Sequence, residues 1–115
     1  MLNQMSVHEL NSRMKNQEEV VLIDCREVSE FQSGHIKNSI NYPLSTLQSK
    51  LHELEQYKDR EMVLICLSGA RSANLTLFLN GQGYTKAYNL QGGVVTWMRE
   101  GHPMVSPQQE NDHGL

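Results

Sequence analysis

Apolar residues gather in short runs along the chain, and segments of mixed apolar and polar residues separate these runs. The runs at 20–23 and 62–65 are continuous, which is typical of strands buried on both faces of a parallel sheet. Shorter runs at 39–42 and 86–90 predict further strands. Pro43 ends the earlier of these, because proline has no N–H group for a strand ladder.

Helices are predicted between the strands. Ser6 and Glu9 form a capping-box pattern at the start of a helix over Val7–Lys15, and residues 45–48 repeat the pattern before a helix that reaches Leu54. The other expected helices are at 27–31, at about 72–79 with Gly81 or Gly83 as its end, and after Gly92-Gly93.

Strands that alternate with helices predict an α/β domain, with a parallel sheet covered by helices on both faces. Ligands bind such sheets beyond the carboxyl ends of the strands. Asp24 follows one continuous run and Cys66 follows the other, so both are expected at that edge. We assign residues 1–105 to one domain and 106–115 to a disordered tail, because the tail holds almost nothing to bury.

Composition excludes several classes of function. The formal net charge of −3, without a cluster of Lys and Arg, argues against a nucleic-acid-binding surface or one attracted to membranes. No apolar run is long enough to cross a bilayer, and the N-terminus lacks a secretory pattern. Two cysteines do not make a disulfide framework for a chain of 115 residues, so a cytoplasmic protein with reduced thiols is expected. His8, His52, His102 and His113 show no metal-ligand spacing, so no metal and no other cofactor is expected.

The segment 66–72, Cys-Leu-Ser-Gly-Ala-Arg-Ser, joins the strand at 62–65 to the next helix, and we call it the Cys66 loop. Gly69 permits close backbone approach, and Arg71 brings a permanent positive charge. Ser68 and Ser72 add hydroxyl groups, and Ser72 is also a candidate for the helix start. Free cysteines are usually small core residues. This setting, with backbone N–H groups and a helix N-terminus at one point, instead predicts a reactive Cys66.

In their order and spacing, segments from about Ser6 to Pro103 resemble the single-domain form of the rhodanese-like family. The matching pieces are Ile23-Asp24-Cys25-Arg26-Glu27, Glu30-Phe31, Gly34-His35-Ile36, Asn41-Tyr42-Pro43, the Cys66 loop, Gly83-Tyr84, Leu90-Gln91-Gly92-Gly93, Trp97, Gly101 and Pro103. The resemblance implies a three-layer α/β domain with a central five-stranded parallel sheet. It also implies sulfurtransferase chemistry at Cys66, with Asp24 and Arg26 supporting nearby loops and His35 in a structural turn.

The expected reaction is transfer of a sulfane sulfur. The Cys66 thiolate takes this sulfur from a small anionic donor such as thiosulfate, and a thiol, a protein acceptor or cyanide removes it from the resulting persulfide. The backbone N–H groups of Leu67, Ser68, Gly69, Ala70, Arg71 and Ser72 are expected to hold the anionic sulfur. Arg71 closes the loop and favours anionic donors.

Other functions stay open. The same loop suits a carrier or partner-binding module that relays persulfide sulfur between proteins with little small-molecule turnover. A non-catalytic regulatory domain is disfavoured because Cys66 and Arg71 are both present. A cysteine phosphatase is also disfavoured, since those enzymes place five residues between cysteine and arginine, whereas four separate Cys66 from Arg71.

Cys25 stands where this family more often has valine or another aliphatic residue. The simpler interpretation is that it packs in the core. The alternative is that it lies close enough to Cys66 to resolve the persulfide as a disulfide. Tyr84, Tyr88 and Trp97 are interpreted as core, although Trp97 could border the pocket.

Overall fold

The computed structural model describes residues 2–108. Its centre is a five-stranded sheet in which every neighbouring pair of strands is parallel. The strands are β1 (Gln4–Met5), β2 (Val21–Asp24), β3 (Ile40–Asn41), β4 (Met62–Ile65) and β5 (Ala87–Leu90), in the order β1-β5-β4-β2-β3. The predicted α/β class with a five-stranded parallel sheet is confirmed.

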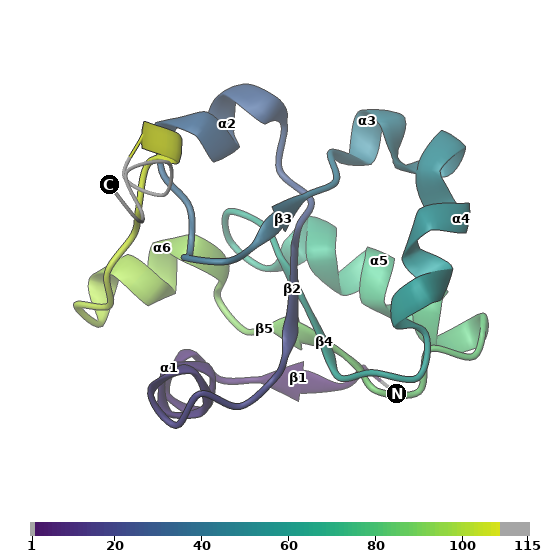
Figure 1. Cartoon of the computed structure of the whole chain (residues 1–115), viewed down its shortest axis with the longest axis horizontal. Helices are drawn as coiled ribbons and strands as arrows, with labels where there is room; N and C mark the ends of the chain where they lie inside the picture. The colour runs from purple at the N-terminus through teal and green to yellow at the C-terminus, as the bar shows by residue number, and fades with distance from the viewer. Residues whose placement is uncertain (1, 109–115) are drawn as a thin grey trace.

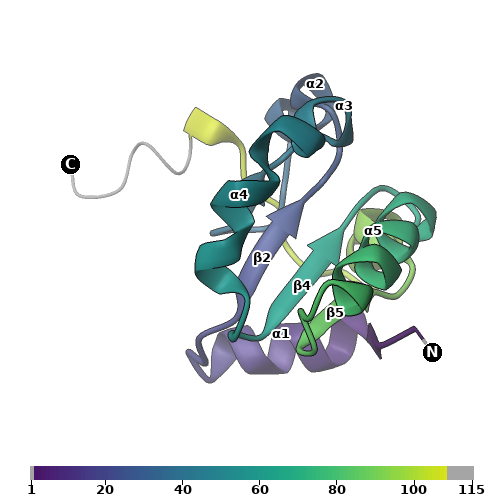
Figure 2. The same ribbon diagram turned by 90° about the vertical axis from the view of Figure 1, so that its right-hand side faces the viewer.

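Helices cover both faces of this sheet. Figure 1 shows α1 (Val7–Lys15) and α6 (Gly93–Arg99) on one side, and α4 (Leu51–Leu54) and α5 (Ala70–Gly81) on the other. The remaining helical segments are α2 (Val28–Ser33), α3 (Leu44–Leu47) and the short 3-10 turns Gln48–Lys50 and Glu55–Tyr57. In Figure 2 the arrows of β2 and β4 point toward α2 and α3, so these two helices lie at the carboxyl edge of the sheet.

The continuous apolar runs are divided between two core clusters by the alternation of strand side chains. Ile23 and Leu64 pack with Leu75 and Leu79 of α5. The neighbouring strand residues Leu22, Val63 and Ile65 belong to the other cluster, which holds Leu10 of α1 and Trp97 of α6. Every residue of β2 and β4 is buried, which explains why both strands are apolar throughout except at Asp24.

One prediction about local structure is wrong, and one strand was missed. The helix expected from 45–48 begins instead at Leu44, directly after Pro43, and a 3-10 turn separates it from α4. Ser45 therefore lies inside the first turn and does not cap the helix. Its hydroxyl donates to Oε1 of Glu27 at 2.6 Å. Strand β1 was not predicted, since Gln4–Met5 is a two-residue strand without an apolar run.

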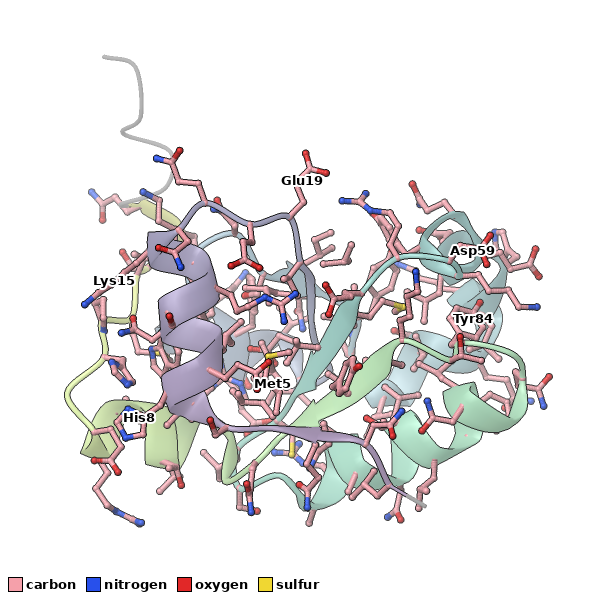
Figure 3. The ribbon with its side chains drawn as sticks, turned by 90° about the horizontal axis from the view of Figure 1, so that it is seen from below. Met5, His8, Lys15, Glu19, Asp59 and Tyr84 are labelled. Carbon is pink, nitrogen blue, oxygen red and sulfur yellow. The ribbon has the colours of Figure 1, made fainter. Side chains whose placement is uncertain are left out.

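The edge of the sheet where the strands begin carries scattered polar groups. Figure 3 looks onto this edge from below and shows Met5 pointing inward, with His8 and Lys15 of α1 pointing outward.

Among residues 2–108, no helix is both long and apolar enough to cross a membrane. Val105 is held by a backbone pairing with His35, with both hydrogen bonds at 2.8 Å. Residues 109–115 of the predicted tail, including His113, lie outside the described residues.

Candidate active site

Cys66 is the first residue after β4, at the carboxyl edge of the sheet as predicted. Its Sγ accepts hydrogen bonds from the backbone N–H of Gly69 at 3.1 Å and from the backbone N–H of Ser72 at 3.4 Å. The Ser72 hydroxyl lies 3.2 Å from the same sulfur. Three polar groups of the Cys66 loop therefore converge on one sulfur atom.

Glycines give the loop its shape. Gly69 caps α5 with a left-handed φ of 95°, which lets its N–H turn back toward Cys66. Gly93 at the start of α6 has φ 61°, and a Cβ there would lie 2.4 Å from the carbonyl oxygen of Leu67. The next two N–H groups of α6, from Val94 and Val95, bind the carbonyls of Cys66 and Leu67 at 3.0 Å each. The start of α6 thus fixes the loop from outside.

Helix α5 begins at Ala70 rather than at about residue 72, so Ser72 lies inside the first turn and does not cap the helix. Its hydroxyl is 2.5 Å from Oδ1 of the buried Asn89 as well as 3.2 Å from Cys66 Sγ. A hydroxyl has one proton, so Ser72 donates to one of these acceptors at a time. Asn89 in turn donates to the side chain of Gln4 in β1 at 3.1 Å. Sequence reasoning missed Asn89, since nothing in the pattern of β5 marks it.

The environment of Cys66 favours the thiolate. The hydrogen bond from the Cys25 thiol is the largest cause that lowers the pKa of Cys66, from 9.0 to about 4. Burial opposes ionisation, and the side chain and N–H of Ser72 and the N–H of Gly69 favour it further. At neutral pH the sulfur is therefore an anion without any separate general base.

Cys25 follows β2 and is fully buried, which confirms its predicted place in the core. It belongs to the same core cluster as Cys66. Its interaction with the Cys66 side chain is the largest cause that raises the pKa of the Cys25 thiol far above the ordinary range, and burial and the negative charge of Cys66 add to it. The pair therefore holds one thiolate, on Cys66, and one thiol, on Cys25.

Arg71 is not a free cation at the mouth of the loop. Its Nη1 and Nη2 donate to Oε1 and Oε2 of Glu30 in α2, both at 3.1 Å. The hydrogen bond from Arg71 is the main cause that lowers the pKa of Glu30 from 4.5 to about 2, and the backbone N–H of Glu27 adds to it. In the sequence, Glu30 is marked only as part of the Glu30-Phe31 motif. Its role as the partner of Arg71 depends on a contact across 41 positions that spacing does not show.

The rest of the Cys66 loop faces outward. Leu67 is 42% exposed, and Ser68 and Ala70 are also exposed. A groove of about 370 Å³ lies between α3, α4 and α5 and is lined mainly by leucines and Phe78. One wall of this groove is attached directly to the cysteine pair, because the N–H of Leu44 donates to the carbonyl of Cys25 at 3.2 Å.

Asp24 and Arg26 lie at the same edge but form a buried unit of their own. The Arg26 guanidinium donates to both carboxylate oxygens of Asp24 at 2.9–3.1 Å and to the carbonyl of Gly34 at 2.7 Å. Alternation along β2 directs the side chain of Asp24 to the face opposite Cys25. This geometry supports a role in fixing the segment around Gly34.

Two other candidates are structural. His35 is fully buried, its Nδ1 lies 2.9 Å from the carbonyl oxygen of Phe31, and its ring stacks on that of Phe31 at 3.7 Å. Trp97 is 1% exposed in the cluster on the α1 and α6 face, and its Nε1 donates to the carbonyl of Pro103 at 2.8 Å. The alternative in which Trp97 borders the pocket is therefore wrong. Over residues 2–108, no group of three or more His, Cys, Asp or Glu side chains is arranged to hold a metal ion.

Comparison with known proteins agrees with this geometry. Residues 6–100 match the family model described as "Rhodanese-like domain". A sulfurtransferase of Allochromatium vinosum is 35% identical over 94% of this chain and 99% of its own length. A putative sulfurtransferase of Bacillus subtilis, YtwF, is 34% identical over 89% of this chain and 96% of its own length.

Solved structures show the same fold. A rhodanese-related protein from Thermoplasma volcanium superposes with a TM-score of 0.80 at 34% identity, covering 90% of this chain and 97% of that one. The matched residues include β2, the Cys66 loop and the start of α6, which together build the sulfur site described above. The chain belongs to the rhodanese-like family of sulfurtransferase domains.

Proposed function

We propose that this chain is a thiosulfate sulfurtransferase, which transfers a sulfane sulfur from thiosulfate, or from another persulfide donor, to a thiophilic acceptor through a persulfide on Cys66. The observation that carries the proposal is the convergence of the Gly69 N–H, the Ser72 N–H and the Ser72 hydroxyl on one cysteine sulfur. Such donors stabilise an anionic sulfur without a metal.

In the first half-reaction, the Cys66 thiolate attacks the outer sulfur of thiosulfate. A new S–S bond forms to Cys66, the S–S bond of thiosulfate breaks, and sulfite leaves with the electron pair. In the second, a thiol, a protein acceptor or cyanide attacks the outer sulfur of the persulfide, and the Cys66 thiolate leaves. The low pKa of Cys66 assists both steps, because it keeps the nucleophile ionised and makes Cys66 a good leaving group.

The surrounding residues have separate roles in this proposal. The N–H groups from Leu67 to Ser72 hold the charge that develops on the outer sulfur, and Gly69 and Ser72 already bind the inner one. Arg71 attracts the anionic donor, at a strength reduced by its pairing with Glu30. Asp24 and Arg26 fix the neighbouring loop. The cycle requires reduced thiols, which favours the cytoplasm as its compartment.

The test is intact mass after a brief incubation with thiosulfate, followed by desalting. The wild type should gain one sulfur atom, and cyanide should remove it with formation of thiocyanate. Cys66→Ala should gain nothing, and Ser68→Ala, which changes an exposed hydroxyl outside the hydrogen bonds to Cys66, should load like the wild type. A gain of sulfur that survives Cys66→Ala would overturn the site, and a wild type whose mass does not change at all, with neither a gain of sulfur nor a loss of two hydrogen atoms, would exclude thiosulfate as donor.

A second function is relay of persulfide sulfur between proteins. It is favoured by two apolar surfaces, the exposed side chain of Leu67 and the groove between α3, α4 and α5, which suit a protein partner better than a small anion. The ion pair with Glu30 neutralises the positive charge of Arg71, which weakens the attraction of a small anionic donor and so also favours a protein donor. Under this alternative, loading from a protein-borne persulfide should be much faster than loading from thiosulfate. For a thiosulfate-dependent enzyme the order should be reversed.

A further inference from the structure

The two cysteines of this chain, Cys25 and Cys66, are cross-strand neighbours. Strands β2 and β4 pair in parallel, with Asp24 opposite Ile65, and Cys25 and Cys66 are the next residue on each strand. The pairing continues over this step, because the N–H of Cys25 donates to the carbonyl of Ile65 at 2.8 Å. Both side chains lie on the same face of the sheet, in the same core cluster.

This placement is compatible with a disulfide. Neighbouring strands lie about 4.7–4.9 Å apart, and disulfides bridge Cα atoms about 4.4–6.8 Å apart. Cys25 and Cys66 stand just beyond the ends of β2 and β4, where the ladder constrains the backbone less than in mid-strand. The two side chains also influence each other's ionisation, since each is the largest cause of the pKa shift of the other.

We propose that Cys25 is a resolving cysteine, which attacks the persulfide on Cys66 and releases the transferred sulfur as sulfide. This inference rests on the proposed persulfide at Cys66. The bond between Cys25 Sγ and Cys66 Sγ forms, and the bond between Cys66 Sγ and the outer sulfur breaks. Both cysteine sulfurs are oxidised to a disulfide, and the sulfane sulfur is reduced to sulfide.

Protons balance within the site. The outer sulfur leaves with the electron pair and takes up the Cys25 proton, so a protonated persulfide yields hydrogen sulfide and an anionic one yields the hydrosulfide anion. Before loading, the Cys66 thiolate keeps the Cys25 proton in place through their hydrogen bond. Once Cys66 carries the outer sulfur, the charge moves to that sulfur, and Cys25 is free to lose its proton as the new bond forms.

Cys25 is specific for this step through its place in the fold. Both thiols are buried, Cys25 at 0% and Cys66 at 1% exposed, but the N–H groups around the Cys66 sulfur belong to a loop at the surface, so external donors and acceptors approach Cys66 through that loop. An external dithiol then reduces the protein disulfide and returns both thiols. The net reaction converts a sulfane sulfur to sulfide at the expense of a dithiol, in competition with direct transfer to an external acceptor.

The experiment follows the loaded protein without any acceptor. Wild type, Cys25→Ser and Cys25→Val are incubated with thiosulfate, desalted, and sampled over time by intact mass and by a sulfide assay. In the wild type, the species with one extra sulfur should convert to one lighter than the reduced protein by two hydrogen atoms, with one equivalent of sulfide released. In both variants the persulfide should persist, with a half-life at least about tenfold longer.

The serine variant separates resolution from support of the thiolate. A serine hydroxyl can donate a hydrogen bond to Cys66, whereas valine cannot, and neither forms a disulfide. If Cys25 only supports the thiolate, the wild type and Cys25→Ser should lose sulfur at the same rate, and that result would overturn the proposal. A rate that rises with protein concentration, with a disulfide-linked dimer in the mass spectrum, would overturn it as well.

A second measurement does not depend on thiosulfate. The reduced wild type is loaded with inorganic polysulfide and, separately, equilibrated with glutathione redox buffers. The proposal expects sulfide release from the loaded protein and an intramolecular disulfide in the oxidising buffers. If thiosulfate fails to load the protein but these results are obtained, thiosulfate is excluded as the donor and the resolving role of Cys25 is still supported. Exclusive formation of glutathione adducts on Cys66 would exclude the disulfide and therefore the resolving role.

Discussion

Glu30 binds Arg71 through two hydrogen bonds of 3.1 Å, and this contact joins α2 to the start of α5 beside the reactive sulfur. The same carboxylate accepts the N–H of Glu27 at 3.0 Å, which completes the capping box of α2. The arginine that closes the Cys66 loop is thus held in place by a helix that sequence spacing does not connect to it. Its positive charge is compensated before any donor arrives.

Glu30→Gln should destabilise the protein at neutral pH by about 1 kcal/mol, the upper end for partly exposed ion pairs. The pKa of Glu30 is about 2 in the folded protein, against an ordinary value of 4.5. The charged carboxylate therefore stabilises the fold fully at pH values above about 4.5. This contribution is lost as the pH falls from 4.5 toward 2, and the difference between wild type and variant should shrink over that window.

Urea unfolding of both proteins at several pH values measures this difference. Glu19→Gln is the matched control, because the Glu19 side chain is 89% exposed and lies 3.7 Å from Arg60, and it should change stability very little. A difference between wild type and Glu30→Gln that stays constant down to the lowest pH would contradict the role given to the Glu30 charge.

Alkylation of Cys66 should be nearly independent of pH from about 6 to 9, because only the thiolate reacts and its pKa is about 4. Below that plateau, the rate should fall as the pH approaches 4. An ordinary cysteine, with a pKa of about 8.5, would instead react about tenfold faster for each pH unit up to that value. Iodoacetamide labelling followed by intact mass gives the profile, and Cys66→Ala provides the blank.

Ser72→Ala should raise the pKa of Cys66, since the Ser72 side chain is one of the donors that lower it. It also leaves Oδ1 of the buried Asn89 without the Ser72 hydroxyl, at a cost of about 1–3 kcal/mol in the free energy of unfolding. Ser72→Thr, which keeps the hydroxyl, should restore part of both quantities. Thiolate absorbance against pH reports the pKa in each variant, and an unchanged titration in Ser72→Ala would contradict the hydrogen-bonding role of Ser72.

The sequence was most informative where apolar residues follow one another without interruption. The two continuous apolar runs predicted β2 and β4 closely, because a strand buried on both faces must be apolar at consecutive positions. That placement also put Cys66 at the carboxyl edge, since the residue after a strand of a parallel sheet lies there. The Cys66 loop was recognisable because glycine, serine and arginine follow the cysteine directly.

The contacts that surround Cys66 were not predictable in the same way. Glu30 and Asn89 come from α2 and β5, and only the folded chain brings them to Arg71 and Ser72. The capping box expected at Ser45 is absent because the helix already begins at Leu44, after Pro43, and the Ser45 hydroxyl donates to Glu27, 18 positions earlier. Strand β1 depends on its pairing with β5 rather than on any pattern of its own.

The start of α6 offers the sharpest test of how the Cys66 loop is held. Gly93 has φ 61°, and a Cβ on it would lie 2.4 Å from the carbonyl oxygen of Leu67 and 2.5 Å from that of Cys66. These oxygens belong to the backbone, so they can move away only if the loop itself moves. Gly93→Ala should therefore cost about 2–4 kcal/mol in the free energy of unfolding, from the strained φ and the steric overlap together.

In Gly93→Ala, displacement of the Cys66 loop should also turn the N–H of Gly69 away from Cys66. Sulfur loading should therefore be slower under conditions in which the variant is still folded. Gly81→Ala is the matched control, because it changes an exposed glycine at the end of α5 with no atom within 4 Å of the added Cβ. That variant should load at the wild-type rate and be equally stable or slightly more so. If Gly93→Ala loads sulfur as fast as Gly81→Ala, the start of α6 does not hold the Cys66 loop in its reactive form.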